Sequence, residues 1–415
     1  MVVKDILRVL YVPHKVFKDI IQNPKYWGPF ILLLIFVLAQ VGSSYVVASR
    51  SYIEQTMPVG DKGDVWTENA ALWQAGPSVT IRNNTADYIN STLYYGSTSI
   101  EFAASNASNV WMELSSLDGS VNCGVDGFKN VSLRVKLVAP DVKPENVSIY
   151  LYSLSGSDFY YDLTQTFSSS DVNVWNNITL TIGVGSEGWV NNGADATWEN
   201  IAGLKLNFAW PSSSNVDLRI DGLFFRGNFK DPFELYGSSY LATSALNAIA
   251  PFLFEWLLLT GLMYVIIKGL KGNVVWRPLM VAVGFALVTL VIQALILAVV
   301  YTSLPNLYYP LEVLAGTLGE FEVAYQVILD EMAFVTLVGV IIQAAIYAWT
   351  VALGTFITRA ITGDKKIAEQ LSMGKVASDA TISRDVTEFG WMKSLLVSGA
   401  SLFLTIIILG LLLGI

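Results

Sequence analysis

The chain has 415 residues, of which 53% are hydrophobic and only 14% are charged. This composition excludes an ordinary soluble protein and indicates an integral membrane protein. Residues 50–235 hold 11 Lys and Arg against 21 Asp and Glu, so the formal net charge of -9 arises in one acidic region, which argues against a nucleic-acid partner. The single cysteine, Cys123, excludes an intramolecular disulfide, and the single histidine, His14, excludes a site built from several histidines.

Residues 1–27 form the first expected element, a cytoplasmic amphipathic segment. Pro24 ends its helix, and Pro29 lies at the start of the next helix. An amphipathic helix at a bilayer surface turns its apolar side chains to lipid and its cations to phosphate headgroups. The same residues are also consistent with a segment whose only role is to fix the orientation of the first span in the membrane. We expect the apolar set to be Ile6, Leu7, Leu10, Val16, Phe17 and Ile20, and the cationic set to be Lys4, Arg8, Lys15 and Lys18.

Five segments are long and apolar enough to span a bilayer, which takes about 20 residues of helix. The first, residues 28–49, is expected to stay as an anchor, because its apolar run is too long for a cleaved signal peptide. The other four lie in residues 239–415 and complete the helical part. The apolar runs extend approximately from Gly28 to Val47, Ala245 to Ile267, Pro278 to Tyr301, Ala333 to Ile357 and Leu395 to Ile415.

Residues 50–238, between the first span and the other four, have the pattern of β-strands. Short runs rich in Val, Ile, Leu, Phe and Tyr alternate with polar residues and are separated by Gly, Asn, Ser or Pro. Several short strands without a helical period predict a sandwich or barrel. The expected fold class is therefore an α-helical transmembrane bundle of five spans with an inserted all-β, jelly-roll-like sandwich. The clearest strands are Val131–Leu137, Val147–Leu154, Ile178–Ile182, Leu204–Phe208 and Val216–Phe225.

The last third of the insert resembles the closing strands of jelly-roll, galactose-binding-like modules. The run Trp198–Leu206 has the pattern W-x-x-I-x-x-[LI], and Leu218–Phe225 contains I-D-x-[LIV]-x-F. Many such modules bind carbohydrate and others are purely structural, so the resemblance implies a sandwich that binds glycans or serves as a spacer. Tryptophan rings can stack on sugars through their flat faces or fill the core between the sheets. The stacking candidates are Trp111, Trp175, Trp189, Trp198 and Trp210.

The N-x-[ST] sequons all lie in the insert, and a glycan is attached only on the extracytoplasmic side. Lys and Arg are retained in cytoplasmic loops. They are frequent in residues 1–27, 268–277 and 359–393, whereas the connection from Thr302 to Met332 has none and carries acids. Both signals predict a cytoplasmic N terminus, with the insert and the C terminus outside. The sequons start at Asn83, Asn90, Asn106, Asn130, Asn146 and Asn177.

The run Val12–Pro29 has Pro13, then Phe17, and the pair Asn23-Pro24 shortly before the first span. It resembles the motif at the start of Yip1-domain proteins. That family has five membrane helices, a cytoplasmic N terminus and a lumenal or external C terminus, which agrees with the topology predicted above. The resemblance implies a role in membrane trafficking or organisation through partner binding. The chain departs from the family in its first external connection, which is short there and holds a whole domain here.

Glu255, four residues after Pro251, is the clearest ionisable residue inside the predicted spans. Intramembrane carboxylates are costly and often functional. Gln40, Gln293 and Gln343 on three other spans come to roughly comparable depth, so we expect a shared polar layer. In it Glu255 is either protonated and held by the amides, each such bond contributing about 0.6 and up to about 2 kcal/mol, or ionised beside a water-filled path.

The expected function is that of a non-enzymatic membrane organiser or scaffold of Yip1-like type, whose sandwich binds glycans or membrane proteins. The alternative is a transporter or its accessory subunit, although five spans without an internal repeat disfavour a self-contained transporter. Nucleotide, zinc-protease, serine-hydrolase and redox motifs are absent, so no catalytic residue, cofactor or metal is expected. Asp221 and Glu199 could ligate a hard cation, but solvated carboxylates are commoner. Sequons without a disulfide favour an archaeal plasma membrane over a eukaryotic endomembrane.

Overall fold

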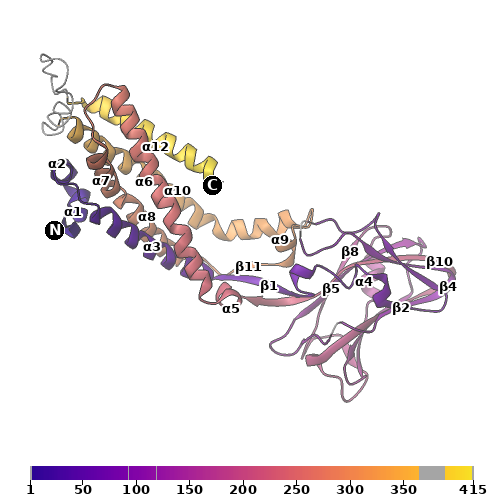
Figure 1. Ribbon diagram of the computed structural model, residues 1–415. Helices are drawn as coiled ribbons and strands as arrows, with labels where there is room; N and C mark the ends of the chain where they lie inside the picture. The colour runs from indigo at the N-terminus through magenta and orange to yellow at the C-terminus, as the bar shows by residue number, and fades with distance from the viewer. Residues whose placement is uncertain (1, 92, 118, 364–387, 414–415) are drawn as a thin grey trace, which may run out of the picture. The chain divides into compact units, whose positions relative to one another are not determined.

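The computed structural model divides into two compact units, which we call the helical unit and the β unit (Figure 1). It describes residues 2–91, 93–117, 119–363 and 388–413. Most of the basic loop expected near 359–393, and Thr92 of the Asn90 sequon, lie outside the described residues. The helical unit comprises Met1–Arg50, Pro232–Pro305 and Glu331–Ile415, and the β unit comprises Ser51–Asp231 and Asn306–Asp330.

The helical unit contains the five long apolar helices expected from the sequence. Helices at Trp27–Ala48, Ser239–Gly269, Trp276–Tyr301, Phe321–Thr362 and Trp391–Leu412 are each long and apolar enough to cross a membrane. The third consists of two helices that meet at Leu287. The helices of this unit are α1 Val2–Tyr11, α2 Pro13–Gln22, α3 Trp27–Ala48, α5 Pro232–Tyr236, α6 Ser239–Gly269, α7 Trp276–Ala286, α8 Val288–Tyr301, α12 Trp391–Leu413 and all but the first ten residues of α10 Phe321–Thr362.

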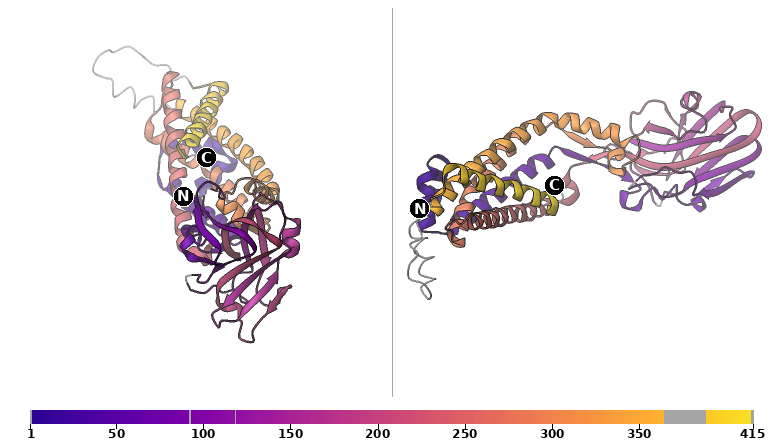
Figure 2. Two further views of the ribbon diagram at one scale, coloured as in Figure 1. Left: turned by 90° about the vertical axis from the view of Figure 1, so that its right-hand side faces the viewer. Right: turned by 90° about the horizontal axis from the view of Figure 1, so that it is seen from above.

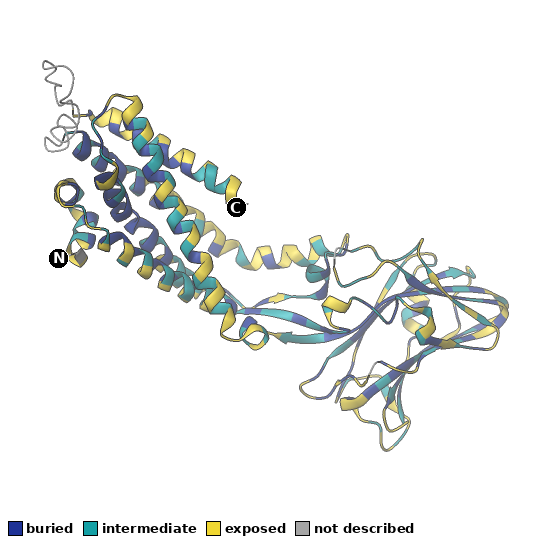
Figure 3. Cartoon of the chain, viewed as in Figure 1, coloured by how far each residue is buried: buried dark blue, intermediate teal, exposed yellow. Residues whose placement is uncertain are grey.

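The core of the helical unit lies where α3, α6, α7 and α8 meet (Figure 3). Phe36 of α3 packs on Phe252 of α6 with ring centroids 5.3 Å apart, and the indole N–H of Trp256 donates to the carbonyl oxygen of Met280 over 2.7 Å. At Gly28 a Cβ would lie 1.9 Å from a phenylalanine ring of α7. The close approach of α3 to α7 therefore requires glycine at that position.

Helices α1 and α2 pack on the other helices of the unit and do not turn their whole apolar face to lipid. An amphipathic helix needs cover for its apolar stripe, and here the neighbouring helices supply it. The expectation of a lipid-facing set is wrong for four of its six members, which are buried: Ile6, Val16, Phe17 and Ile20. The segment is amphipathic as expected, because Lys4, Lys15 and Lys18 are exposed on its other side.

The β unit is built from antiparallel strands and short helices, together with one parallel pair (Figures 1 and 2). Its strands are β1 Ser51–Met57, β2 Trp73–Ala75, β3 Val79–Asn84, β4 Ser99–Leu114, β5 Asn130–Ala139, β6 Asn146–Ser153, β7 Asp158–Asp162, β8 Asn176–Thr181, β9 Trp189–Asn191, β10 Ile201–Lys230 and β11 Leu307–Tyr309. Its helical elements are η1 Gly60–Lys62, η2 Ala70–Leu72, α4 Thr164–Ser169, η3 Trp198–Asn200, α9 Leu311–Ala315 and the start of α10.

The two longest strands, β4 and β10, contribute to both layers of a sandwich. The first layer has the order β9-β7-β6-β10-β4-β2, in which residues 204–209 of β10 pair with 109–114 of β4. The second layer has the order β8-β5-β10-β4-β3, in which residues 216–220 of β10 pair with 100–104 of β4. The register shifts between Ala209 and Val216 mark the place where both strands pass from one layer to the other. The all-β insert expected from the sequence is confirmed.

The core of the β unit lies between these two layers. Leu204 and Phe208 of β10 enter it from the first layer, and Leu218 and Ile220 enter it from the second. Cys123 lies in the same core, and burial raises the pKa of its thiol to about 12. The thiolate is the reactive form of cysteine, so this side chain is inert near neutral pH.

The connection between the third and fourth long helices is part of the β unit. In it, β11 pairs in parallel with β1. The carboxylate of Glu320 accepts two hydrogen bonds from Arg134, of 2.6 and 2.5 Å, and that of Glu312 accepts two from Arg226, of 2.6 and 2.8 Å. The sequence assigned residues 50–238 to the insert and 239–415 to helices. The structure instead ends the first segment of the β unit at Asp231 and adds 306–330.

Candidate functional site

The first layer presents an outer face of aromatic and polar side chains. Successive side chains of a strand point to opposite sides, so the strand that buries Ile149 and Leu151 turns Tyr150 and Tyr152 outward. Both tyrosines are half-buried. The outer face continues on the neighbouring strand β7, where Tyr160 pairs with Tyr150.

One row of paired positions crosses the whole first layer. Directly paired residues have Cβ atoms about 5 Å apart and interact as nearest neighbours. The rings of Tyr150 and Tyr160 are tilted, with centroids 5.2 Å apart, and a lysine and a glutamate follow them in the row. From β9 to β2 the row reads Val190, Tyr160, Tyr150, Lys205, Glu113 and Gln74.

Trp111 of β4 lies beside this row. The Nζ atom of Lys205 is 4.8 Å from the Trp111 ring centroid, and the hydroxyl of Tyr152 donates to Glu113 over 3.5 Å. Burial and the charge of Glu113 raise the pKa of Tyr152, so its hydroxyl keeps the proton and stays a donor at physiological pH. We call the following set the aromatic face: Tyr150, Tyr152, Tyr160, Trp111, Lys205 and Glu113.

The outer face of the second layer is closed by ion pairs. Asp87 pairs with Lys136 over 2.9 Å and with Arg219, and it accepts a hydrogen bond of 3.1 Å from the indole of Trp175. Although burial acts in the other direction, these three donors lower the pKa of Asp87. Glu101 is likewise held by an arginine and an asparagine. Asp87 and Glu101 are thus held by neighbouring donors, so they offer less to a ligand than the aromatic face does.

The structure does not bring the five candidate tryptophans together. Trp198 and Trp210 lie in the core, with 8% and 5% of their surfaces exposed, and Trp198 is stacked on a phenylalanine ring 3.8 Å away. Neither offers a free face to a sugar unless the core opens. Trp189 is half-buried against Trp198, and Trp175 belongs to the second layer. Trp111 joins the aromatic face, and sugar stacking stays a prediction.

Sequence reasoning missed the tyrosines of the aromatic face. The signal was present in the run Ser148–Ser153, where Ile149 and Leu151 alternate with Tyr150 and Tyr152. Alternation identifies two faces of a strand. Alternation does not show which strands are neighbours in the sheet, so it cannot predict which side chains together form a binding surface.

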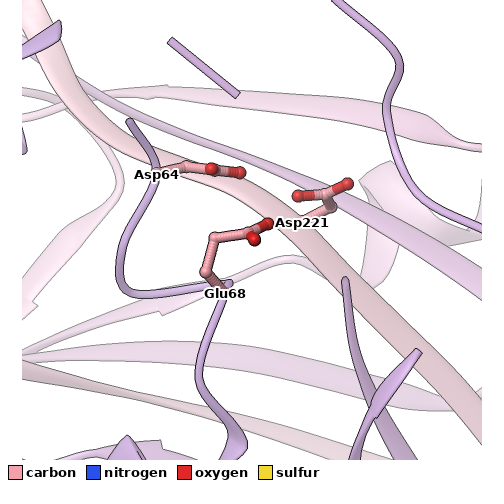
Figure 4. A group of neighbouring side chains, drawn as sticks. All are labelled: Asp64, Glu68 and Asp221. Atoms are coloured by element: carbon pink, nitrogen blue, oxygen red, sulfur yellow. The ribbon is translucent and has the colours of Figure 1, made fainter. Parts of the chain in front are cut away.

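Three carboxylates from distant parts of the β unit meet at one point (Figure 4). Asp64 and Glu68 precede η2, and Asp221 belongs to β10; one oxygen from each lies within 4.8 Å of the others. Carboxylate oxygens are ligands of hard cations such as Ca²⁺, so this group could hold one. Sequence reasoning named Glu199 beside Asp221, but Glu199 lies next to Gly124 instead.

Backbone N–H groups hold the carboxylates in position. Asp221 accepts from Ile89 over 2.6 Å and from Gly222 over 2.7 Å, and Asp64 accepts from Gly96 over 2.7 Å. Burial and the charge of Asp64 raise the pKa of Asp221 well above its usual range, and burial also raises that of Asp64. The pair therefore retains a proton at a pH where an exposed aspartate has lost it.

The polar residues expected in one layer of the helical unit come together in part. The side-chain amide of Gln293 on α8 donates to that of Gln343 on α10. Tyr347 of α10 lies close enough to Gln343 and Glu255 to interact with both. Within the described residues, no hydrogen bond joins Glu255 to the three glutamines, and Gln40 lines a separate cavity. The role of Glu255 as glue or as part of a path stays a prediction.

The sequon asparagines are spread over the surface of the β unit. Asn130 is half-buried and the other five are exposed. The side chain of Asn83 accepts a hydrogen bond of 2.7 Å from the Ala70 N–H and donates one of 2.9 Å to the carbonyl oxygen of Glu68. A glycan on Asn83 would be attached to the nitrogen atom that donates to Glu68, so Asn83 is less free to react than its exposure alone suggests. The five exposed sequon asparagines are Asn83, Asn90, Asn106, Asn146 and Asn177.

No protein-family model matches the chain, and no curated protein matches its sequence. Similar solved structures include a family 11 carbohydrate-binding module from Clostridium thermocellum in complex with a beta-1,3-1,4-mixed-linked tetrasaccharide, with 12% identity, a TM-score of 0.27 and coverage of 41% of this chain and 94% of that chain. They also include the beta-1,2-glucanase from Parabacteroides distasonis, with 13% identity, a TM-score of 0.28 and coverage of 38% and 24%. Because these TM-scores are below 0.5, the sandwich assignment rests on the strand pairing of this chain.

Proposed function

We propose that this chain is a non-enzymatic integral membrane protein of Yip1-like type that acts in membrane organisation or trafficking, with an external β-sandwich that binds glycans. The aromatic face is the observation that supports the binding part. A sugar ring has an apolar C–H side and a rim of hydroxyls. Aromatic rings can cover the apolar side, while Lys205 and Glu113 can hydrogen-bond to the hydroxyls.

Replacing Tyr150 and Tyr160 by alanine is expected to weaken glycan binding at least about tenfold, or about 1.4 kcal/mol. Each aromatic contact contributes about 0.5–1.5 kcal/mol beyond its buried area, and both rings lie in the same row. The measurement is a glycan array probed with the purified full chain in detergent, followed by calorimetric titration of the glycan that binds best.

The matched control is Tyr88→Ala, which removes a half-buried tyrosine from the loop between β3 and β4, away from the aromatic face. It is expected to bind as the unaltered chain does. Failure of the unaltered chain to bind any glycan, or equal binding by Tyr150→Ala/Tyr160→Ala, would overturn the proposal.

The proposed topology has residues 1–27 in the cytoplasm and the β unit outside, in an archaeal plasma membrane. Residues 51–231 and 306–330 fold into one unit, so they must lie on the same side of any membrane that the intervening helices cross. Those helices form two of the long apolar segments, and two crossings return the chain to its starting side. This agrees with the sequons and the basic loops, which are independent of it.

Cysteine labelling tests this topology. The native Cys123 is buried and inert, so it is expected to give no background labelling. Asp195→Cys, on an exposed loop of the β unit, is expected to react with a membrane-impermeant maleimide in intact cells. Lys15→Cys on α2 is expected to react only after the cells are permeabilised. The reverse pattern would invert the orientation, and labelling of both in intact cells would remove the membrane assignment.

The transporter alternative is tested by measuring the flux of solutes into liposomes that contain the protein. Glu255→Gln keeps the size of the side chain and removes its charge, so loss of flux in this variant would favour a path through the helices. Unchanged flux, or none in either protein, would leave the glycan-binding proposal in place.

A further inference from the structure

A polar groove lies between the last turns of α3 and the first turns of α6. Its volume is 640 Å³. Gln40 enters it from the middle of α3, and Pro251 closes its deep end on α6. The groove is lined by Phe36, Gln40 and Ser44 of α3, Tyr236 of α5, and Ser239, Tyr240, Thr243, Ser244, Asn247, Ala248 and Pro251 of α6.

Several hydrogen-bonding groups in the groove lack protein partners. Within the described part of the chain, neither the side-chain amide of Gln40 nor that of Asn247 makes a hydrogen bond. Pro251 lies inside α6 and has no N–H, so the carbonyl oxygen of Asn247 loses its donor four residues on. The hydroxyls of Ser44 and Ser244 bond to each other over 2.5 Å. The groove thus offers two amides and a backbone carbonyl to an occupant.

The depth of these groups makes an occupant necessary. Gln40 lies eight residues before Ala48, the last residue of α3, which corresponds to about 12 Å at 1.5 Å per residue. A membrane crossed by α3 would place this amide below the headgroups, where an unsatisfied polar group costs several kcal/mol. Water or a polar ligand must therefore fill the space between Gln40 and Asn247.

The lining selects an uncharged ligand. Among the described residues that line the groove, none is Asp, Glu, Lys, Arg or His. Ser44 of α3 and four residues of α6 contribute hydroxyls: Ser239, Tyr240, Thr243 and Ser244. The cavity at the other end of α3 differs, because Lys25 and Arg277 line it beside Tyr26 and Trp27. An anionic phosphate headgroup has counter-charges there and none in the polar groove. Hydroxyls and amides, by contrast, match the donors and acceptors of a polyol.

We propose that the polar groove binds the headgroup of an uncharged, hydroxyl-rich lipid, such as a glycolipid, from the outer leaflet. The hydroxyls of the headgroup satisfy Gln40, Asn247 and the freed carbonyl. The lipid tails lie on the apolar flank of α6 beside the groove, where Leu246 is 68% exposed. This proposal rests on the membrane embedding proposed above and not on glycan binding by the aromatic face.

Native mass spectrometry of the full chain tests the proposal with two lipids. Digalactosyldiacylglycerol is expected to stay bound to the unaltered chain at least about tenfold better than phosphatidylglycerol. Gln40→Leu/Asn247→Leu is expected to lose this preference. The milder variant Ser44→Ala/Ser244→Ala removes two hydroxyls that line the groove and can accept from the headgroup, and it is expected to weaken this preference. Thr302→Val, which removes an exposed hydroxyl after the end of α8 outside the groove, is expected to have no effect.

Equal retention of the two lipids, retention of neither, or unchanged retention by both groove variants would each overturn the proposal. Tyr150→Ala/Tyr160→Ala separates it from glycan binding by the β unit, because this variant is expected to hold the galactolipid as the unaltered chain does. If it loses the galactolipid and the groove variants do not, the lipid binds to the aromatic face and the groove holds water.

Discussion

Arg226→Ala is expected to destabilise the β unit by about 3–5 kcal/mol. The guanidinium bridges Glu54, with two hydrogen bonds of 2.9 Å, and Glu312, with bonds of 2.6 and 2.8 Å. Glu54 is only 2% exposed and also accepts from the backbone N–H groups of Gly227 and Leu311. Removing the cation leaves a buried carboxylate without its counter-charge, and this is the costly way to break a buried ion pair.

Hydrogen exchange measured by mass spectrometry reports this loss locally. Peptides from β1 and β10 are expected to exchange about 100-fold faster or more in Arg226→Ala, while peptides from α3 and α8 are unchanged. The matched control is Arg82→Ala, because the Arg82 side chain is 66% exposed and such pairs contribute about 0–1 kcal/mol. Equal protection in the two variants would show that the Glu54–Arg226–Glu312 network does not stabilise the fold.

The same network shows why part of the domain division could not be predicted from the sequence. The acidic connection from Thr302 to Met332 has the composition of a solvated external loop. Charge alone predicts the side of the membrane on which it lies, but the partners of Glu312 and Glu320 are Arg226 and Arg134, 86 and 186 residues away. The pairing of β11 with β1 brings this connection to the β unit, and the sequence does not reveal that pairing. A fragment that ends before Asn306 would leave both arginines without these carboxylates, so binding experiments need the full chain.

The parts that sequence reasoning predicted are those governed by local periodicity. Long apolar runs give the helices, and alternation gives the strands from Val131 to Phe225. The two sites depend instead on which strands are neighbours. Asp221 illustrates this. Glu199 is nearby in the sequence but lies elsewhere in the fold, whereas Asp64 and Glu68 are far away in the sequence and lie beside Asp221. Burial separates the tryptophans in the same way, because Trp198 of η3 lies in the core whereas Trp111 of β4 lies on the outer face of the first layer.

The carboxylate cluster leads to the second large expected effect, a stability that falls as the pH rises. Burial and the charge of Asp64 raise the pKa of Asp221 in the folded chain, whereas in the unfolded chain it has the ordinary value of about 3.9. Between these two values the folded state binds more protons. The stabilisation is therefore complete below about pH 4 and is lost as the pH rises through the folded pKa, by up to about 1.4 kcal/mol for each pH unit.

Asp64→Asn is expected to reduce this dependence in part, because it leaves the burial of Asp221 unchanged and removes the second cause, the negative charge that faces it. The substitution preserves local bonding: the amide oxygen still accepts from the Gly96 N–H, and the NH₂ group can donate to Asp221 or to the hydroxyl of Thr67. Hydrogen exchange of β10 peptides between pH 4 and 8, corrected for the intrinsic rate, gives the slope. The measurement is made with EDTA so that no divalent cation replaces the proton. Asp195→Asn, an exposed aspartate of the same unit, should keep the original slope. A slope that is zero in the unaltered chain, or the same in Asp64→Asn, would mean that Asp64 and Asp221 do not share a proton in the folded state.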